Sequence, residues 1–283
     1  MTVPPRPEWH SCTDGRFNQV RPWLGLSLSL LTLLVAGCAT VPPPAKVAVQ
    51  VDPRITMERF NRDQQGRRER LRHWQVAGVL EVSGDKGSRR YRTEIKGEMA
   101  QQAQVTLFGL MQQIVAVLFA GPEEIRLVDA EQRHITEVPA SAAGLYHLIG
   151  IGLQPEVLFE SMIAVADALT EPDAALPNGW WTRQGEQLLL NPETGLIEER
   201  SGETESGGSY RVIYQWPDSP DDPLLPMPTQ VRVQLLPGET RIHYKARQWH
   251  TVEQPFAADW FSPLQLYPDF TIERPFRDRP AQP

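Results

Sequence analysis

Residues 74–138 alternate between apolar and polar positions with a period of two, which is the pattern of strands that bury one face. Val76, Leu80 and Val82 show the alternation first. Turn sequences such as Gly121-Pro122 separate the segments. The pattern predicts about six short strands joined as antiparallel hairpins. Their ranges are 76–82, 91–95, 104–108, 114–119, 125–128 and 134–138.

Residues 141–170 interrupt this pattern with apolar positions at helical spacing. A first helix is predicted around Leu145, and Pro155 suits the first turn of a second one. Pro172 and Pro177 end the second helix. The apolar positions of the two helices are Leu145, Leu148, Ile149, Val157, Leu158, Met162, Val165, Ala166 and Leu169.

Alternation resumes at Gly179 and continues to Trp249. The expected strands are 188–190, 196–200, 210–216, 231–236 and 241–249. Two blocks of strands around a helical insert predict one curved antiparallel sheet with helices across it. A further helix is predicted over 55–73, mostly exposed because its apolar positions are sparse. The polar, proline-rich tail 274–283 is predicted to be disordered.

Residues 1–37 have the pattern of a targeting segment. Arg16 and Arg21 precede the apolar run 23–36, which has the length of a signal-peptide core and is too short to span a bilayer comfortably. Val35-Ala36-Gly37-Cys38 resembles the lipobox of bacterial lipoproteins. The resemblance implies cleavage before Cys38 and a permanent anchor of acyl chains on that cysteine. An uncleaved signal anchor is the alternative, and the long segment before the apolar run leaves the true start codon open.

The residues after the cysteine indicate the membrane to which the protein is sorted and a tether between the lipid anchor and the domain. Ala39 follows Cys38 where enteric inner-membrane lipoproteins carry Asp, so the resemblance implies the periplasmic face of the outer membrane. Pro42-Pro43-Pro44 favours a stiff, extended tether over 38–53. The tether leads to a single domain predicted over 54–273.

Composition and charge exclude several classes of function. The chain has 28 Lys+Arg and 35 Asp+Glu, a net charge of -7, and its charges are interspersed without a basic stripe. This argues against nucleic acid and against attachment to anionic headgroups. Cleavage at residue 37 removes Cys12 and leaves Cys38, which carries lipid, so no disulfide or thiol nucleophile is expected. Neither HExxH, GxSxG, a P-loop nor a dinucleotide glycine pattern occurs, so no enzyme, metal or cofactor is expected.

The connection 105–113 differs from an ordinary hairpin turn, whose tip is polar. It places Phe108, Leu110 and Met111 around Gly109. Taken alone, these residues favour a tip that folds under a neighbouring element, or strands that continue through a bulge.

The stretch 74–132 resembles the first half of the proteins of the LolB family. These are outer-membrane lipoproteins that receive other lipoproteins from the periplasmic carrier LolA. The matching pieces are Val76 to Val82, Phe108-Gly109-Leu110, Ile114 to Phe119, Gly121-Pro122 and Leu127-Val128-Asp129. Near the other end, Leu225-Pro226-Met227-Pro228 precedes Val231 and Val233, followed by Ile242, Tyr244 and Trp249, in a similar order. The helical insert is longer than in that family and the tip differs, which points to the wider LolA/LolB-like superfamily.

The resemblance implies a mainly β fold with a helical lid (α+β): an incomplete antiparallel barrel of about eleven or twelve strands around a hydrophobic cavity. It implies a monomer that takes cargo acyl chains from a LolA-type carrier and inserts lipoproteins in the outer membrane. By position, Leu110 would enter the bilayer, with Phe108 and Met111 assisting. Candidate cavity residues are Leu107, Val115, Val117, Phe119, Leu148, Leu158, Met162 and Val165.

Other readings stay open. The candidate cavity residues could be ordinary core, because the register that decides which face they occupy is not fixed by the sequence. The same scaffold could serve as a non-enzymatic structural or interaction module of the envelope. A hydrolase without a recognisable motif is the third alternative.

Overall fold

The computed structural model describes residues 53–84, 87–99, 102–220, 222, 225–238, 240–257, 260–261 and 267–276. The predicted signal peptide, Cys38, the tether up to residue 52 and the tail 277–283 lie outside the described residues. Among those described, no helix is long and apolar enough to cross a membrane.

Hairpins form the first half of the structure, as the alternating pattern predicts. Its strands are β1 (His73–Gly84), β2 (Gly87–Glu98), β3 (Gln102–Phe108), β4 (Ile114–Ala120), β5 (Glu124–Asp129) and β6 (His134–Pro139). Alternate residues point to opposite faces of the sheet. In β2, Thr93, Ile95 and Gly97 are accordingly buried between more exposed neighbours.

The second half repeats this arrangement after the helical insert. Its strands are β7 (Leu169–Pro172), β8 (Gly179–Thr182), β9 (Gln187–Leu190), β10 (Ile197–Glu203), β11 (Ser209–Gln215), β12 (Gln230–Leu236) and β13 (Arg241–Thr251). A last strand, β14 (Thr271–Glu273), returns to the first half and pairs in parallel with β6.

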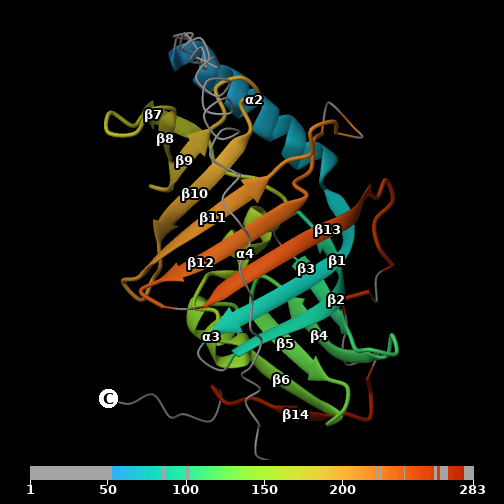
Figure 1. Cartoon of the computed structure of the whole chain (residues 1–283). Coiled ribbons are helices and arrows are strands. Elements are labelled where there is room, and N and C mark those ends of the chain that lie inside the picture. The colour runs from blue at the N-terminus through green and yellow to red at the C-terminus, as the bar shows by residue number, and fades with distance from the viewer. Residues whose placement is uncertain are drawn as a thin grey trace, which may run out of the picture. The chain divides into compact units, whose positions relative to one another are not determined.

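The described strands form a single open sheet in the order β14-β6-β5-β4-β3-β2-β1-β13-β12-β11-β10-β9-β8-β7 (Figure 1). Strand β1 joins the two halves, since Val76 lies opposite Ile95 of β2 on one side and Trp249 of β13 on the other. This confirms the expected incomplete antiparallel barrel. The described sheet has 14 strands rather than eleven or twelve, because the short strands at its margins, β7 and β14, have no clear alternating signal.

Three described helices pack against the sheet: α2 (Pro53–Arg70), α3 (Ala142–Ile149) and α4 (Pro155–Met162). In Figure 1, α2 crosses the upper end of the sheet and α3 and α4 lie behind the strands. The Ser141 side chain caps α3 by accepting a hydrogen bond from the Gly144 N–H, and Gly150 ends it at φ 75°. Pro155 occupies the first turn of α4, as predicted.

The prediction that the second helix reaches Leu169 was wrong. Helix α4 ends at Met162, and Ala164 follows at φ 50°, a left-handed conformation that stops a helix. Side chains of α2 then hold the non-helical segment: Gln64 Oε1 accepts from the Ala166 N–H at 3.1 Å, and Asn61 Oδ1 accepts from the Leu169 N–H at 2.8 Å. Tertiary contacts therefore override the helical spacing of these apolar residues.

Apolar side chains form cores on both faces of the sheet. The larger core lies between the sheet and the helices and contains Trp74, Leu118, Phe159 and Val212. A smaller one contains Val117, Phe119, Val128 and Ile135, packed against Phe261, Tyr267, Phe270 and Ile272 of the C-terminal segment. Strand β4 is therefore apolar throughout because each of its faces is covered.

Candidate functional site

The loop between β3 and β4 projects two apolar side chains into solvent. Leu110 is 104% exposed and Met111 is 88% exposed, while Phe108 at the end of β3 is half-buried. The alternative in which the tip folds under a neighbouring element is therefore excluded. We call Phe108, Leu110 and Met111 the apolar tip.

Local hydrogen bonds hold the backbone that carries the tip. The Gly109 N–H donates to the Gln113 carbonyl at 2.9 Å, and the Gln112 N–H donates to the Gly109 carbonyl at 3.1 Å. The Gln113 side-chain oxygen accepts from the Met111 N–H at 2.9 Å. Gln113 accepts hydrogen bonds from two backbone N–H groups of the loop, those of Gly109 and Met111, and so helps to close the loop without help from the apolar side chains.

A cleft of about 760 Å³ opens between the start of α4 and the ends of β8 to β11. We call it the rim cleft. Its apolar lining consists of Leu153, Val157, Trp181, Tyr210 and Leu236. Leu236 is 47% exposed and stands at the edge of the opening. Polar residues, among them Gln154 and Glu186, share the wall, so the site is amphipathic.

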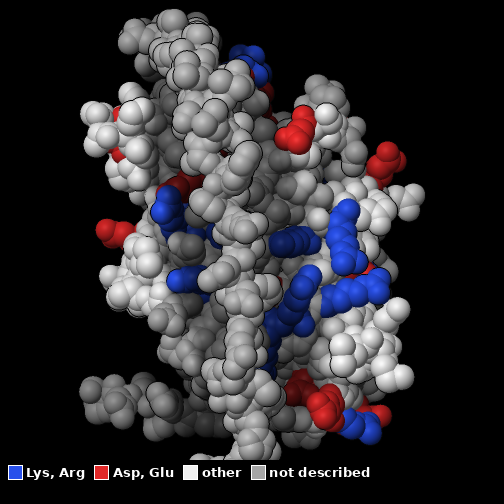
Figure 2. All heavy atoms as spheres, viewed as in Figure 1, with Lys and Arg blue, Asp and Glu red and all other residues white. Residues whose placement is uncertain are grey.

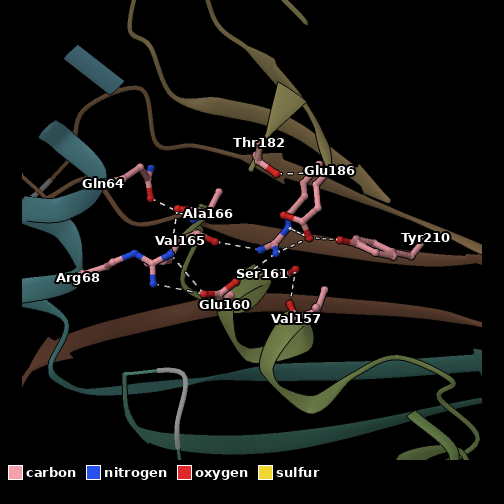
Figure 3. Close-up of polar contacts among 11 residues, drawn as sticks. Gln64, Arg68, Val157, Glu160, Ser161, Val165, Ala166, Thr182, Glu186 and Tyr210 are labelled. Atoms are coloured by element: carbon pink, nitrogen blue, oxygen red, sulfur yellow. Dashed lines mark hydrogen bonds and ion pairs between the residues drawn. The ribbon is translucent and has the colours of Figure 1, made fainter. Parts of the chain in front are cut away.

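A buried ionic cluster lies beside the rim cleft (Figure 3). The fully buried Arg200 of β10 donates through Nη2 to Glu186 Oε1 at 2.6 Å and to Glu160 Oε2 at 3.1 Å. Its Nη1 donates to the Val165 carbonyl at 3.0 Å. Tyr210 donates its hydroxyl to Glu186 Oε1. The cluster therefore ties α4 and the segment after it to the sheet.

Helix α2 contributes to the same cluster. Arg68 donates to Glu160 Oε1 at 3.4 Å and to the Ala166 carbonyl at 3.1 Å (Figure 3). Burial raises the pKa of Glu160, although Arg200 and Arg68 oppose this rise. Burial alone would lower the pKa of Arg200, but the facing Glu186 carboxylate raises it, so Arg200 stays charged. Glu186 lines the rim cleft, and its Oε2 is buried without a hydrogen-bond partner among the described residues.

The predicted cavity residues do not line one open space. Leu158, Met162 and Val165 are at most 7% exposed and pack in the larger core, with Leu107 and Leu148 at its margin. Val117 and Phe119 point to the opposite face, where the C-terminal segment covers them. Val115 is half-buried and shares their strand parity. The prediction that Val115, Val117 and Phe119 line the cavity was therefore wrong, because these residues lie on the other side of the sheet.

Sequence reasoning missed the rim cleft. Trp181 and Leu236 lie far apart in the chain and meet through strand order, which alternation does not reveal. Leu153 and Val157 carry a weak signal, because they flank the Pro155 that starts α4. Within the described ranges, no group of three or more His, Cys, Asp or Glu residues could hold a metal ion.

The open antiparallel sheet with helices across one face is shared with solved structures of other bacterial proteins. A Vibrio parahaemolyticus domain provisionally named an outer membrane lipoprotein-sorting protein is 6% identical, with a TM-score of 0.50 over 74% of this chain and 97% of that chain. A DUF1329 family protein from Desulfovibrio piger is 7% identical, with a TM-score of 0.51 over 76% and 100%. A LolA superfamily protein from Nitrosomonas europaea is 10% identical, with a TM-score of 0.48 over 72% and 98%.

No protein-family model and no curated protein matches the sequence. At these identities the solved structures show the fold, and they confirm at that level the resemblance seen in the sequence.

Proposed function

We propose that this protein is a lipid-anchored envelope lipoprotein that binds cargo acyl chains and passes lipoproteins from a LolA-type periplasmic carrier to the outer membrane. The observation that carries the proposal is the exposure of Leu110 and Met111 on a loop closed by its own hydrogen bonds. The name of the Vibrio relative supports a role in lipoprotein sorting. The acyl chains on Cys38 would hold the protein, as a monomer, at the periplasmic face.

The rim cleft is the proposed entry for an acyl chain. Val157, Trp181 and Leu236 offer apolar surface there, and each methylene buried contributes about 0.8 kcal/mol. Deeper entry requires α4 to separate from β10, because the layer between them is filled by side chains. Breaking a buried ion pair costs about 3–5 kcal/mol, so burial of roughly four to six methylenes would offset the loss of the Arg200–Glu160 contact.

The apolar tip is the proposed point of delivery. Substituting Leu110 with Glu places a charge where the tip would enter the bilayer. We expect Leu110→Glu to retain the wild-type thermal midpoint and cargo binding and to lose transfer of a lipoprotein to outer-membrane vesicles. Gln112→Glu adds the same charge two residues away at another exposed position and should retain most of the transfer.

Two results would count against this role. If Leu110→Glu lowered the thermal midpoint strongly, Leu110 would be part of the core. If it folded normally and still delivered cargo at the wild-type rate, the tip would have no part in delivery.

The packed layer under α4, together with an exposed apolar tip, favours a second candidate function: an interaction module that binds another envelope protein through the tip. Mass spectrometry of lipids bound to the full chain separates the two. An acyl lipid whose binding is reduced by Val157→Glu in the rim cleft supports the carrier. Lipid binding that Val157→Glu leaves unchanged, with Leu110→Glu abolishing a protein cross-link, supports the module.

A further inference from the structure

Cations that are dispersed in the sequence gather on the face of the sheet opposite α4. Figure 2 shows Lys and Arg side chains across the middle of this face, over β12, β13, β1 and β2. The gathering follows from strand register, because directly opposite residues share a face. We call this set the basic face; it consists of Arg90, Arg92, Arg232, Arg241 and Lys245.

Cross-strand pairing places these cations in adjoining rows. One row joins Arg92, Val79 and Lys245 across β2, β1 and β13. The next row joins Arg90, Glu81, His243 and Arg232 from β2 to β12. A third row pairs Ser83 with Arg241. The interspersed charge of the sequence therefore does not describe the charge of this surface.

The cations of the basic face are available to a partner. All five are exposed, and none forms an ion pair within the part of the chain that the structure describes. Glu81, the carboxylate within these rows, accepts a hydrogen bond from Ser88 at 3.0 Å. His243 lies between the rows; burial lowers its pKa, and Arg232 and Lys245 lower it further. The surface is therefore strongly positive although the chain carries a net charge of -7.

The basic face continues into the apolar tip. Arg92 lies directly opposite Phe108 across β2 and β3, and Phe108 in turn pairs with Ile114, which is 42% exposed. Neighbouring strands lie about 4.8 Å apart, so Lys245 and the start of the tip are separated by roughly 14 Å. Leu110 and Met111 follow Phe108 and are the most exposed large hydrophobic residues within the described ranges.

We propose that the basic face binds the phosphate-bearing headgroups of anionic phospholipids in the bilayer that the apolar tip enters; this deepens the proposed function and rests on its membrane contact. Exposed apolar residues beside cations are the combination with which peripheral proteins hold anionic membranes. The cations lie in rows on a broad sheet face rather than around a pocket, which suits a surface of many headgroups better than one acidic side chain. The basic face would orient the domain so that the tip reaches the bilayer.

The test uses the full chain in vesicles of phosphatidylcholine with or without phosphatidylglycerol. A fluorophore attached in the variant Leu110→Cys reports immersion of the tip in the bilayer. A second fluorophore, attached in the variant Gln234→Cys, lies beside Arg241 on the basic face. Quenching of this second fluorophore by a spin-labelled lipid reports contact of the basic face with headgroups. We expect phosphatidylglycerol to increase both signals and salt to reverse the increase. Replacing Arg90, Arg92 and Lys245 with Gln should reduce the equilibrium constant for docking of this face on anionic vesicles roughly 100-fold, about fivefold for each cation.

Arg62→Gln/Arg70→Gln/Arg183→Gln is the matched control, because it removes the same charge from exposed positions outside the basic face. The proposal is overturned if phosphatidylglycerol leaves the Gln234 signal unchanged, or if both triple variants lose the signal equally. If the tip were immersed but the basic face made no contact with headgroups, the inference about the basic face would be overturned and the proposed function would stand. Headgroup contact without immersion in either vesicle would refute the proposed entry of the tip and leave the basic face as an anionic-lipid site.

Discussion

At Gly144 the backbone of α3 packs so closely that no side chain fits. A Cβ there would lie 2.1 Å from the Pro139 carbonyl oxygen, a backbone atom at the end of β6. We expect Gly144→Ala to destabilise the protein by about 1–3 kcal/mol, because either α3 or the strand end must shift. Urea unfolding followed by circular dichroism measures the change.

Gly66 provides the matched control for this prediction. It lies within α2, and a Cβ there would meet nothing within 4 Å. Gly66→Ala should therefore stabilise the protein by about 0.5–1 kcal/mol through the lower backbone entropy of the unfolded chain. Equal effects of the two substitutions would show that the close contact at Gly144 is not what limits that site.

Arg200 is the residue whose charge the buried cluster depends on most. Arg200→Leu leaves Glu186 buried without its cation and leaves Glu160 with only the more distant Arg68, and we expect a loss of about 3–5 kcal/mol in unfolding free energy. The pair between Arg211 of β11 and Glu199 of β10 lies at the surface and serves as a control, where Arg211→Leu should cost less than about 1 kcal/mol.

Neutralising the partners should recover much of that loss. In Arg200→Leu/Glu160→Leu/Glu186→Gln, no carboxylate of this cluster stays buried, and the amide oxygen at position 186 can still accept from Tyr210. Thermal unfolding at neutral pH measures this recovery. A triple variant as unstable as Arg200→Leu would show that the shape of Arg200, rather than its charge, is what the site requires.

Among the elements, β14 is held by a carboxylate that should make its attachment sensitive to acid. Glu137 accepts from Arg126 at 3.1 Å and from Arg274, just after β14, at 2.9 Å. Burial acts to raise the pKa of Glu137, but these hydrogen bonds hold it below its ordinary value. A lowered folded-state pKa stabilises the fold above the ordinary carboxyl pKa, and this contribution is lost as the pH falls through the folded value.

We therefore expect amide protection of β14 to decrease on acidification before that of β1. Glu137→Gln should show weak protection of β14 at neutral pH and little further change on acidification. Glu131→Gln, an exposed carboxylate in the turn before β6, should behave as the wild type. Hydrogen exchange followed by mass spectrometry distinguishes these outcomes, and simultaneous loss of β1 and β14 in the wild type would contradict the role of Glu137.

Period-two alternation was sufficient to predict most strands, but not the side to which each residue points. Strand β4 is apolar at nearly every position, so no polar face marks its orientation, and Val117 and Phe119 were placed on the wrong side. The covering C-terminal segment contributes only three residues of strand, too few for a periodic signal. The end of α4 was missed for a related reason: its limit depends on Asn61 and Gln64, about a hundred residues earlier in the chain.

At the scale of the whole molecule, the two halves of the chain should unfold together. Strand β1 pairs along its length with β2 and with β13, and one continuous core contains residues from Phe60 to Tyr244. We expect tryptophan fluorescence and far-ultraviolet circular dichroism to report one coincident urea transition. Separate transitions for the two probes would mean that the halves are independent.

The candidate site could be predicted only in part from the sequence, because much of it is formed by residues that are distant in the chain. The apolar tip is contiguous in sequence, so its unusual composition was visible in the residues. Those residues alone favoured a tip folded under a neighbouring element, and only the family resemblance pointed to exposure of Leu110 and Met111. The rim cleft and the basic face are assembled from strands that are distant in the chain. Arg92 and Lys245 share a row only because β13 returns beside β1, and no local pattern indicates that return.

The margins of the sheet have a consequence for proteins crowded together on one surface. An open sheet could add a strand from any neighbour, yet one margin is β7, four residues long and ending in Pro172, and the other is the three-residue β14, laid parallel on β6. Short strands and proline are what natural sheets use to discourage such additions. Copies held at high density on one membrane should therefore stay separate molecules and should not associate through their sheet edges.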